Sequence, residues 1–159
     1  MADDLYDTDI LAWAEQQAGL LRRAAAGERV NGLDWPNLIE EIEDLGRSEL
    51  RAVRSNLLQG LVHLLKIAGW PDSDAVAHRQ AEAVACLGEA AEDATASIRR
   101  KLDLPDLYAR ALVQVRTDRI DRRPPRDLPA ECPYTLDDLL RRIRDPAAMS
   151  DLLAPLTER

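Results

Sequence analysis

The stretch from Trp35 to Pro71, WPNLIEEIEDLGRSELRAVRSNLLQGLVHLLKIAGWP, constrains the fold more than any other part of the chain. Its apolar residues recur three and four positions apart, which is the spacing of one face of an α-helix. At about 100° of rotation per residue they form a single stripe along the whole stretch. The pattern predicts a core face around which the other helices pack, consisting of Leu38, Ile42, Leu45, Leu50, Val53, Leu57, Leu61 and Leu64.

Gly46 leaves two interpretations of this stretch. Glycine resembles a helix end and Ser48 resembles a new N-cap, so the chain could form two helices here. However, the apolar residues on both sides of Gly46 share one face, and two separate helices would have no reason to do so. We therefore prefer one long helix, straight or kinked. Gly46 falls inside the stripe, so a neighbouring helix could pack closely there and Gly46→Leu would overpack the face.

Composition indicates the fold class. Hydrophobic residues make up 46% of the 159 residues, mostly as leucine and alanine, and phenylalanine is absent. No segment shows the alternation of a half-buried strand. A chain of this length can bury the core of one domain without disulfides or metals. We predict a single domain over residues 1–159, all-α, forming a mainly antiparallel helical bundle of four longer helices plus short C-terminal helices.

Capping residues place the helix that precedes the long one. Asp7 or Thr8 is the expected N-cap of this first helix, which ends before Gly27, and Asp34 followed by Trp35 and Pro36 starts the long helix. The first helix is amphipathic, and the face expected to be buried consists of Ile10, Trp13, Ala14, Gln17, Leu21 and Ala24.

Two further helices are expected after the long one. A cap at Asp72 or Ser73 begins a helix with a thin, alanine-rich apolar face that continues to Leu102. Asp103 and the proline after it begin a fourth helix. That helix cannot continue past the adjacent prolines at 124 and 125.

The C-terminal part is expected to be extended first and then helical. Residues from about 124 to 133 read as an extended, Pro-rich connection. Thr135 with Asp138 has the spacing of a capping box and begins a short helix. Asp145 with Pro146 begins another short helical turn.

Charge is distributed unevenly along the chain. Residues 1–50 contain 12 acidic and 4 basic residues, so they account for the whole net charge of −8. Residues 99–126 contain nine basic and four acidic residues. The basic stretch 116–126 has interleaved acids and no aromatic residue for base stacking, so the pattern excludes a nucleic-acid role.

Targeting patterns are missing from the sequence. No segment approaches the ~18 uninterrupted apolar residues of a membrane span, and the N-terminus is acidic, unlike a signal peptide. We expect a cytoplasmic protein with no membrane association. Cys86 and Cys132 lack metal-site and CxxC spacing and are interpreted as reduced thiols.

Three segments resemble one bacterial family: YDTDILAWAEQQAGLLR at 6–22, LDWPNLIEEIEDLGRSE at 33–49 and LPAECPYTLDDLL at 128–140. Together with HLLK at 63–66, they are similar in kind and order to domain of unknown function 29. The chain departs from the family pattern in AHRQAEAVACLGEAAEDA, where a Trp-Arg pair and a charged helix are usual. The resemblance implies a small, soluble, helical bacterial protein, and it implies no catalytic or binding residue.

The acidic cluster in the long helix has a structural and a functional interpretation. Glu40, Glu41, Glu43 and Asp44 are spread around the side opposite the apolar stripe, as on a solvated face, and Glu43 with Arg47 forms an i, i+4 pair. In the functional interpretation, acidic side chains attract a basic protein partner. The candidate interaction residues are Asp7, Asp9, Glu40, Glu41 and Asp44.

The alternative function is a metal-dependent helical-bundle enzyme that uses His63 and nearby carboxylates. His63 and His78 are the only histidines, and a hairpin between their helices would bring them to similar levels. His78 lies roughly opposite the apolar face of its own helix, which argues against a shared site. The sequence contains no nucleophile, phosphate-binding or zinc motif. We therefore favour a non-enzymatic regulatory or protein-interaction module without a cofactor.

Overall fold

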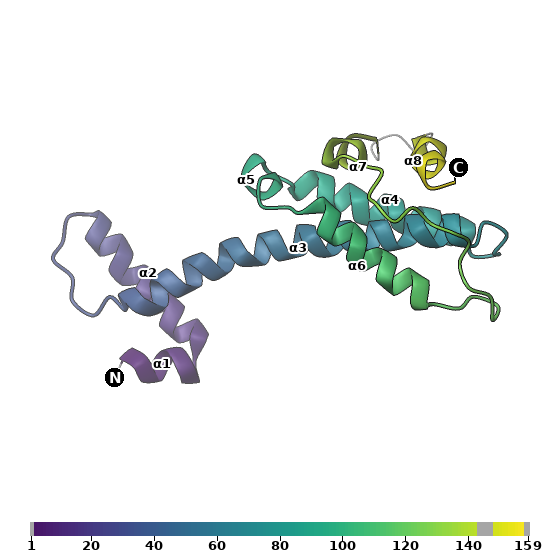
Figure 1. Cartoon of the computed structure of the whole chain (residues 1–159). Coiled ribbons are helices and arrows are strands. Elements are labelled where there is room, and N and C mark those ends of the chain that lie inside the picture. Colours follow the sequence, from purple (N-terminus) through teal and green to yellow (C-terminus); the bar gives the residue numbers. More distant parts are fainter. Residues whose placement is uncertain (1, 143–147, 158–159) are drawn as a thin grey trace. The chain divides into compact units, whose positions relative to one another are not determined.

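The computed structural model describes residues 2–142 and 148–157 (Figure 1). This part of the chain is all-α, as predicted, and contains no β-strand. Contacts divide the chain into two compact units, Met1–Ser48 and Glu49–Arg159. The extent of the predicted single domain, residues 1–159, remains a prediction.

The first unit contains α1 (Ala2–Thr8), α2 (Ile10–Ala25) and the beginning of α3 (Trp35–Gly69). The described residues of the second unit contain the rest of α3, followed by α4 (Val76–Asp93), α5 (Ala96–Arg99), α6 (Leu104–Thr117), α7 (Leu136–Arg142) and α8 (Met149–Thr157). The four longer helices are therefore α2, α3, α4 and α6.

Helix α3 continues through Gly46 without a break, which confirms the interpretation as one long helix. Asp34 caps it as predicted, because its Oδ1 accepts a hydrogen bond from the backbone N–H of Asn37 at 3.4 Å.

The core of the second unit surrounds the C-terminal half of α3. From Gly60 to Trp70 nearly every residue of the chain is buried, including apolar residues on opposite sides of the helix such as Leu65 and Ile67. A helix that is apolar all round must be covered on all sides. Helix α4 returns alongside α3 (Figure 1), and it packs so closely that a Cβ atom at Gly60 would overlap the Leu87 side chain. The predicted core residues Val53, Leu57, Leu61 and Leu64 are confirmed.

Three of the predicted helix boundaries are wrong. The N-cap of α4 is Ala75 and not the predicted Asp72 or Ser73. The N-cap of α2 is Asp9, because α1 already occupies Asp7 and Thr8. The third predicted helix does not reach Leu102, since α4 ends at Asp93 and Thr95 caps the short helix α5 through the N–H of Ile98. A threonine that caps locally in this way competes with continuation of a helix.

The C-terminal part follows the sequence pattern more closely. Asp103 caps α6 by accepting from the N–H of Asp106 at 3.0 Å, and residues 124–133 form a connection without helix or strand. Tyr108 fastens this connection by donating to the carbonyl of Pro129 at 2.9 Å. Thr135 and Asp138 form the predicted capping box at the start of α7. The start predicted at Asp145 and Pro146 lies outside the described residues.

Candidate protein-interaction surface

A buried polar network fastens the segment before α3 to α2. The carboxylate of Asp34, which is 8% exposed, accepts from the Trp13 indole N–H at 3.1 Å and from the Asn37 side chain at 2.8 Å. The backbone N–H of Asp34 donates to Gln17 Oε1 at 2.9 Å, and Gln17 Nε2 donates to the carbonyl of Gly32 at 3.2 Å. Burial alone raises the pKa of Asp34, but hydrogen bonds from Asn37 and Trp13 outweigh it and lower the pKa. The first unit is therefore organised around a satisfied polar centre.

Tyr6 attaches α1 to α3. Its hydroxyl donates to Glu41 Oε1 at 2.7 Å, and its ring packs edge-on against Trp13 with centroids 4.9 Å apart. The hydrogen bond to Glu41, with a contribution from burial, raises the pKa of Tyr6 to about 12. Glu41 and Leu38 are half-buried on the same side of α3. The cover that α1 and α2 provide in this unit therefore extends over only one side of α3.

The acidic residues predicted to bind a partner all lie in the first unit: Asp7, Asp9, Glu40, Glu41 and Asp44. Asp9 caps α2, Glu41 accepts from Tyr6, and Asp44 pairs with Arg47. Asp7 and Glu40 are exposed. Three of the five thus have a structural contact already.

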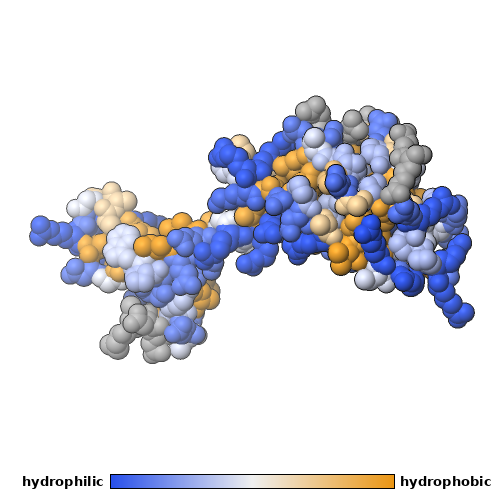
Figure 2. Space-filling model, viewed as in Figure 1, coloured by the Kyte–Doolittle hydropathy of each residue, from blue (hydrophilic) through white to orange (hydrophobic). Residues whose placement is uncertain are grey.

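Exposed apolar side chains are concentrated in this same unit. Among the described residues eight large hydrophobic side chains are exposed, and only Val113 of α6 lies in the second unit. Figure 2 shows hydrophobic surface over the beginning of α3. The seven in the first unit are Ile10, Leu11, Leu21, Trp35, Ile39, Ile42 and Leu45.

The prediction that Ile42 and Leu45 belong to the core is therefore wrong, since they are 69% and 66% exposed. The expectation that another helix of the chain packs over Gly46 is also wrong. A Cβ atom at Gly46 would have no described atom within 4 Å apart from its own helix and chain neighbours. Periodicity identified an apolar face correctly, but it could not tell whether the chain itself covers that face.

The exposed residues of α3 form a definite line. Trp35, Ile39, Ile42 and Gly46 follow one another at spacings of four, three and four residues. Relative to Ile42 they lie at about 20°, 60°, 0° and 40° around the helix axis. We call these four residues the α3 stripe. Monomeric soluble proteins rarely leave such a contiguous apolar surface uncovered unless it binds something.

Among the described residues, His63 does not form the metal site of the alternative function. Burial lowers the pKa of its imidazole, while the charge of Glu82 on α4 opposes that effect. Its Nδ1 is buried without a hydrogen-bond partner among the described residues. No group of three or more His, Cys, Asp or Glu side chains in the described ranges is placed to hold a metal ion.

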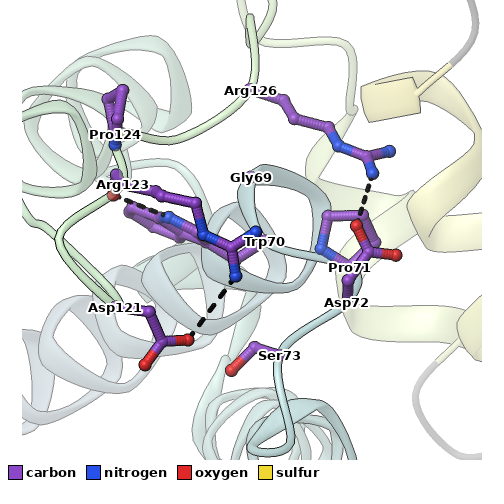
Figure 3. Close-up of a pocket in the computed structure, with 9 residues that line it drawn as sticks. All are labelled: Gly69, Trp70, Pro71, Asp72, Ser73, Asp121, Arg123, Pro124 and Arg126. Atoms are coloured by element: carbon purple, nitrogen blue, oxygen red, sulfur yellow. Dashed lines mark hydrogen bonds and ion pairs between the residues drawn. The ribbon is translucent and has the colours of Figure 1, made fainter.

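A pocket of about 230 Å³ lies where the α3–α4 connection meets the segment after α6 (Figure 3). Its charged lining residues pair with each other: Arg126 with Asp72 at 2.7 Å and Arg123 with Asp121 at 3.7 Å. The Trp70 indole donates to the carbonyl of Arg123 at 3.0 Å. These contacts hold the two segments together.

The described residues thus define an all-helical protein whose unusual surface is an acidic unit with uncovered apolar side chains. In these residues, no helix is long and apolar enough to cross a membrane. The chain belongs to the family described as domain of unknown function DUF29, whose model matches residues 5–143. This confirms the resemblance found in the sequence.

A solved structure supports the fold. The crystal structure of an α-helical protein of unknown function from Rhodospirillum rubrum is similar, with a TM-score of 0.68 and 28% sequence identity over 93% of this chain and 96% of that chain. A comparison with curated proteins gave no match. Neither the family nor this neighbour indicates an enzymatic or other specific function.

Sequence reasoning missed two residues of the α3 stripe. Ile39 lies outside the face that the sequence predicts, and Trp35 belongs to a predicted helix start. The four-three-four spacing of these residues was a usable signal, because it is the spacing of a seam between two helices.

Proposed function

We propose that the protein is a non-enzymatic protein-interaction module whose first unit binds a basic protein partner. One observation carries this proposal: the unit that exposes seven of the eight large hydrophobic side chains exposed in the described part of the chain also carries most of the net charge. Residues 1–48 contain 11 acidic and 4 basic residues, a net charge of −7, whereas the full chain has −8.

The two properties contribute differently to binding. Burial of apolar side chains supplies affinity, at roughly 25 cal/mol for each Å² removed from water. The acidic field mainly selects a partner of opposite charge and speeds its association. A surface with both properties favours a partner that presents an apolar patch bordered by lysine or arginine.

The test compares partner capture by variants whose substituted residues are similarly exposed in the wild type. The full-length protein and two variants, Ile42→Ser and Val113→Ser, capture partners from lysate of the source cells. Ile42 and Val113 are 69% and 66% exposed, but they lie in different units. We expect a basic protein that binds wild type and Val113→Ser and is lost with Ile42→Ser. Equal loss with both variants, or no loss with either, would contradict the proposal.

A charge-reversed bait tests the electrostatic part. Glu40→Lys, Glu41→Lys and Asp44→Lys together change the charge of the first unit by six. We expect this bait to lose the partner at low salt, and we expect high salt to weaken capture by wild type, because salt screens exposed charges. If the same proteins are captured with both baits while the variant only loses stability, the acidic side chains are structural.

A further inference from the structure

The shape of the α3 stripe specifies what kind of segment can cover it. The sequence of spacings from Trp35 to Gly46, four, three and four residues, is the heptad spacing with which one helix presents a seam to another. From Trp35 to Gly46 the line is about 16 Å long, or three helical turns. The next seam positions are Glu49, which is charged, and Val53, which the second unit buries. The available seam therefore ends near Gly46.

An extended peptide fits this surface less well than a helix. Peptides bind as strands by adding to the edge of a sheet, where main-chain hydrogen bonds supply much of the affinity. The described residues of the first unit are helical or looped and offer no such edge. A ligand on α3 can contact only side chains, and a helix-on-helix arrangement places those contacts at regular intervals.

Gly46 adds a second geometric requirement. The space into which a Cβ atom at position 46 would project is unoccupied. No described atom outside the local helix and the chain neighbours lies within 4 Å of that Cβ position. Between the large side chain of Ile42 and the carboxylate of Glu49, the glycine leaves a depression along the seam. A helix that crosses here can insert a large apolar side chain, as a knob enters a hole.

Two kinds of helix have the form needed to cover the stripe: one from a second copy of this chain, and one from another protein. Charge decides between them. Glu43, which pairs with Arg47 at 3.2 Å, and Glu49 border the stripe, at about 100° and 340° around the axis. Two copies would bring units of net charge −7 together, which opposes self-association through this surface. A helix flanked by lysine or arginine would instead place opposite charges at both borders.

We infer that the α3 stripe binds a cationic amphipathic helix, whose apolar face covers Trp35, Ile39 and Ile42 and inserts a large side chain over Gly46. This inference rests on the proposed function and names the form and chemistry of the partner. It identifies Gly46, which makes no side-chain contact of its own, as a specificity-determining residue.

The experiment uses the full-length protein and synthetic 21-residue peptides. The first peptide has leucine at the seam positions of a heptad repeat and lysine at the flanks. The second has the same composition in an order that destroys the apolar face, and the third has glutamate in place of lysine. Binding is followed by fluorescence anisotropy at two salt concentrations. We expect the first peptide to bind at least about tenfold more tightly than either control.

The decisive variant is Gly46→Leu. Because the position is open, the substitution leaves the fold of the free protein intact, which circular dichroism and thermal unfolding verify. A leucine would fill the depression, so we expect the affinity for the first peptide to fall about tenfold. Val113→Ser is the control and should leave the affinity unchanged.

Specific results overturn the inference. Equal binding of the first and second peptides would show that charge alone is recognised, and unchanged affinity in Gly46→Leu would show that no helix packs over the glycine. Self-association of wild type that Ile42→Ser abolishes would assign the stripe to a second copy. If a cellular partner depends on Ile42 but is indifferent to Gly46→Leu, the proposed function stands and this inference fails.

Discussion

Gln17 shows how a single side chain can define the small first unit. It is 1% exposed and joins two backbone groups, the N–H of Asp34 and the carbonyl of Gly32. A glutamine in an amphipathic pattern would ordinarily be placed at the border of the buried face. Here it is central because the segment before α3 needs hydrogen-bond partners that no secondary structure supplies.

Gln17→Ala therefore has a clear expected effect. It leaves the Asp34 N–H and the Gly32 carbonyl without their partner, which costs about 1–3 kcal/mol for a buried polar group. Hydrogen exchange measured by mass spectrometry should show faster exchange in residues 10–48. Gln16→Ala is the matched control, since Gln16 is exposed. Similar exchange in both variants would contradict a structural role for Gln17.

The lowered pKa of His63 should make the stability of the second unit depend on pH. Burial lowers its pKa below the ordinary value of about 6.5, although Glu82 opposes the shift and Lys66, His78 and Arg79 add to it. The unfolded chain therefore binds a proton at higher pH than the folded chain. The contribution of His63 to the free energy of unfolding should be fully present above pH ~6.5, and it should be lost as the pH decreases below that value.

The measurement is urea denaturation between about pH 5 and 7.5, a range that spans the ordinary histidine pKa. His63→Gln should remove much of the loss of stability toward low pH, whereas His78→Gln, at an exposed position on α4, should retain it. A wild-type protein whose stability rises as the pH falls below 6.5 would contradict the direction of the His63 pKa shift.

At the scale of elements, α3 is one helix with two different environments. Its first part is covered on one side only and exposes Ile42, whereas its second part is enclosed and buries Leu65 and Ile67 on opposite sides. Periodicity predicted the helix, its start at Asp34 and its continuity through Gly46. It could not predict coverage, because the apolar pattern of a core face is the same as that of a binding face.

Two of the glycines of α3, Gly46 and Gly60, test this division with the same substitution. Gly46→Ala should stabilise the protein by about 0.5–1 kcal/mol, because alanine favours an exposed helix and meets no neighbour there. Gly60→Ala should destabilise it by about 1–3 kcal/mol, because the added Cβ would overlap Leu87. Urea denaturation measures both. A strongly destabilised Gly46→Ala protein would contradict a continuous helix at this position.

The capping motifs also separate what the sequence could predict from what it could not. Asp103 and the Thr135–Asp138 box were found from local patterns, since a cap depends on residues within one turn. The Asp34 network was found only as a cap, because its contacts to Trp13 and Gln17 span a loop. Contacts between residues distant in sequence leave little local signal. The buried polar network of the first unit could therefore not be predicted from the sequence.

At the scale of the whole molecule, charge and exposed apolar surface coincide in one unit. The first 48 residues carry a net charge of −7 and only a small core, while the second unit buries most of the hydrophobic side chains. A unit with so little buried apolar surface gains stability when a partner covers it, because binding to the folded state adds to folding free energy.

The most direct measurement is photo-crosslinking in living source cells with a photoreactive residue at position 42, and with the same residue at position 113 as a control. We expect an adduct from position 42 only, joined to a lysine- or arginine-rich helical segment of another protein. Equal adducts from both positions, an adduct to a second copy, or no adduct at position 42 would contradict it.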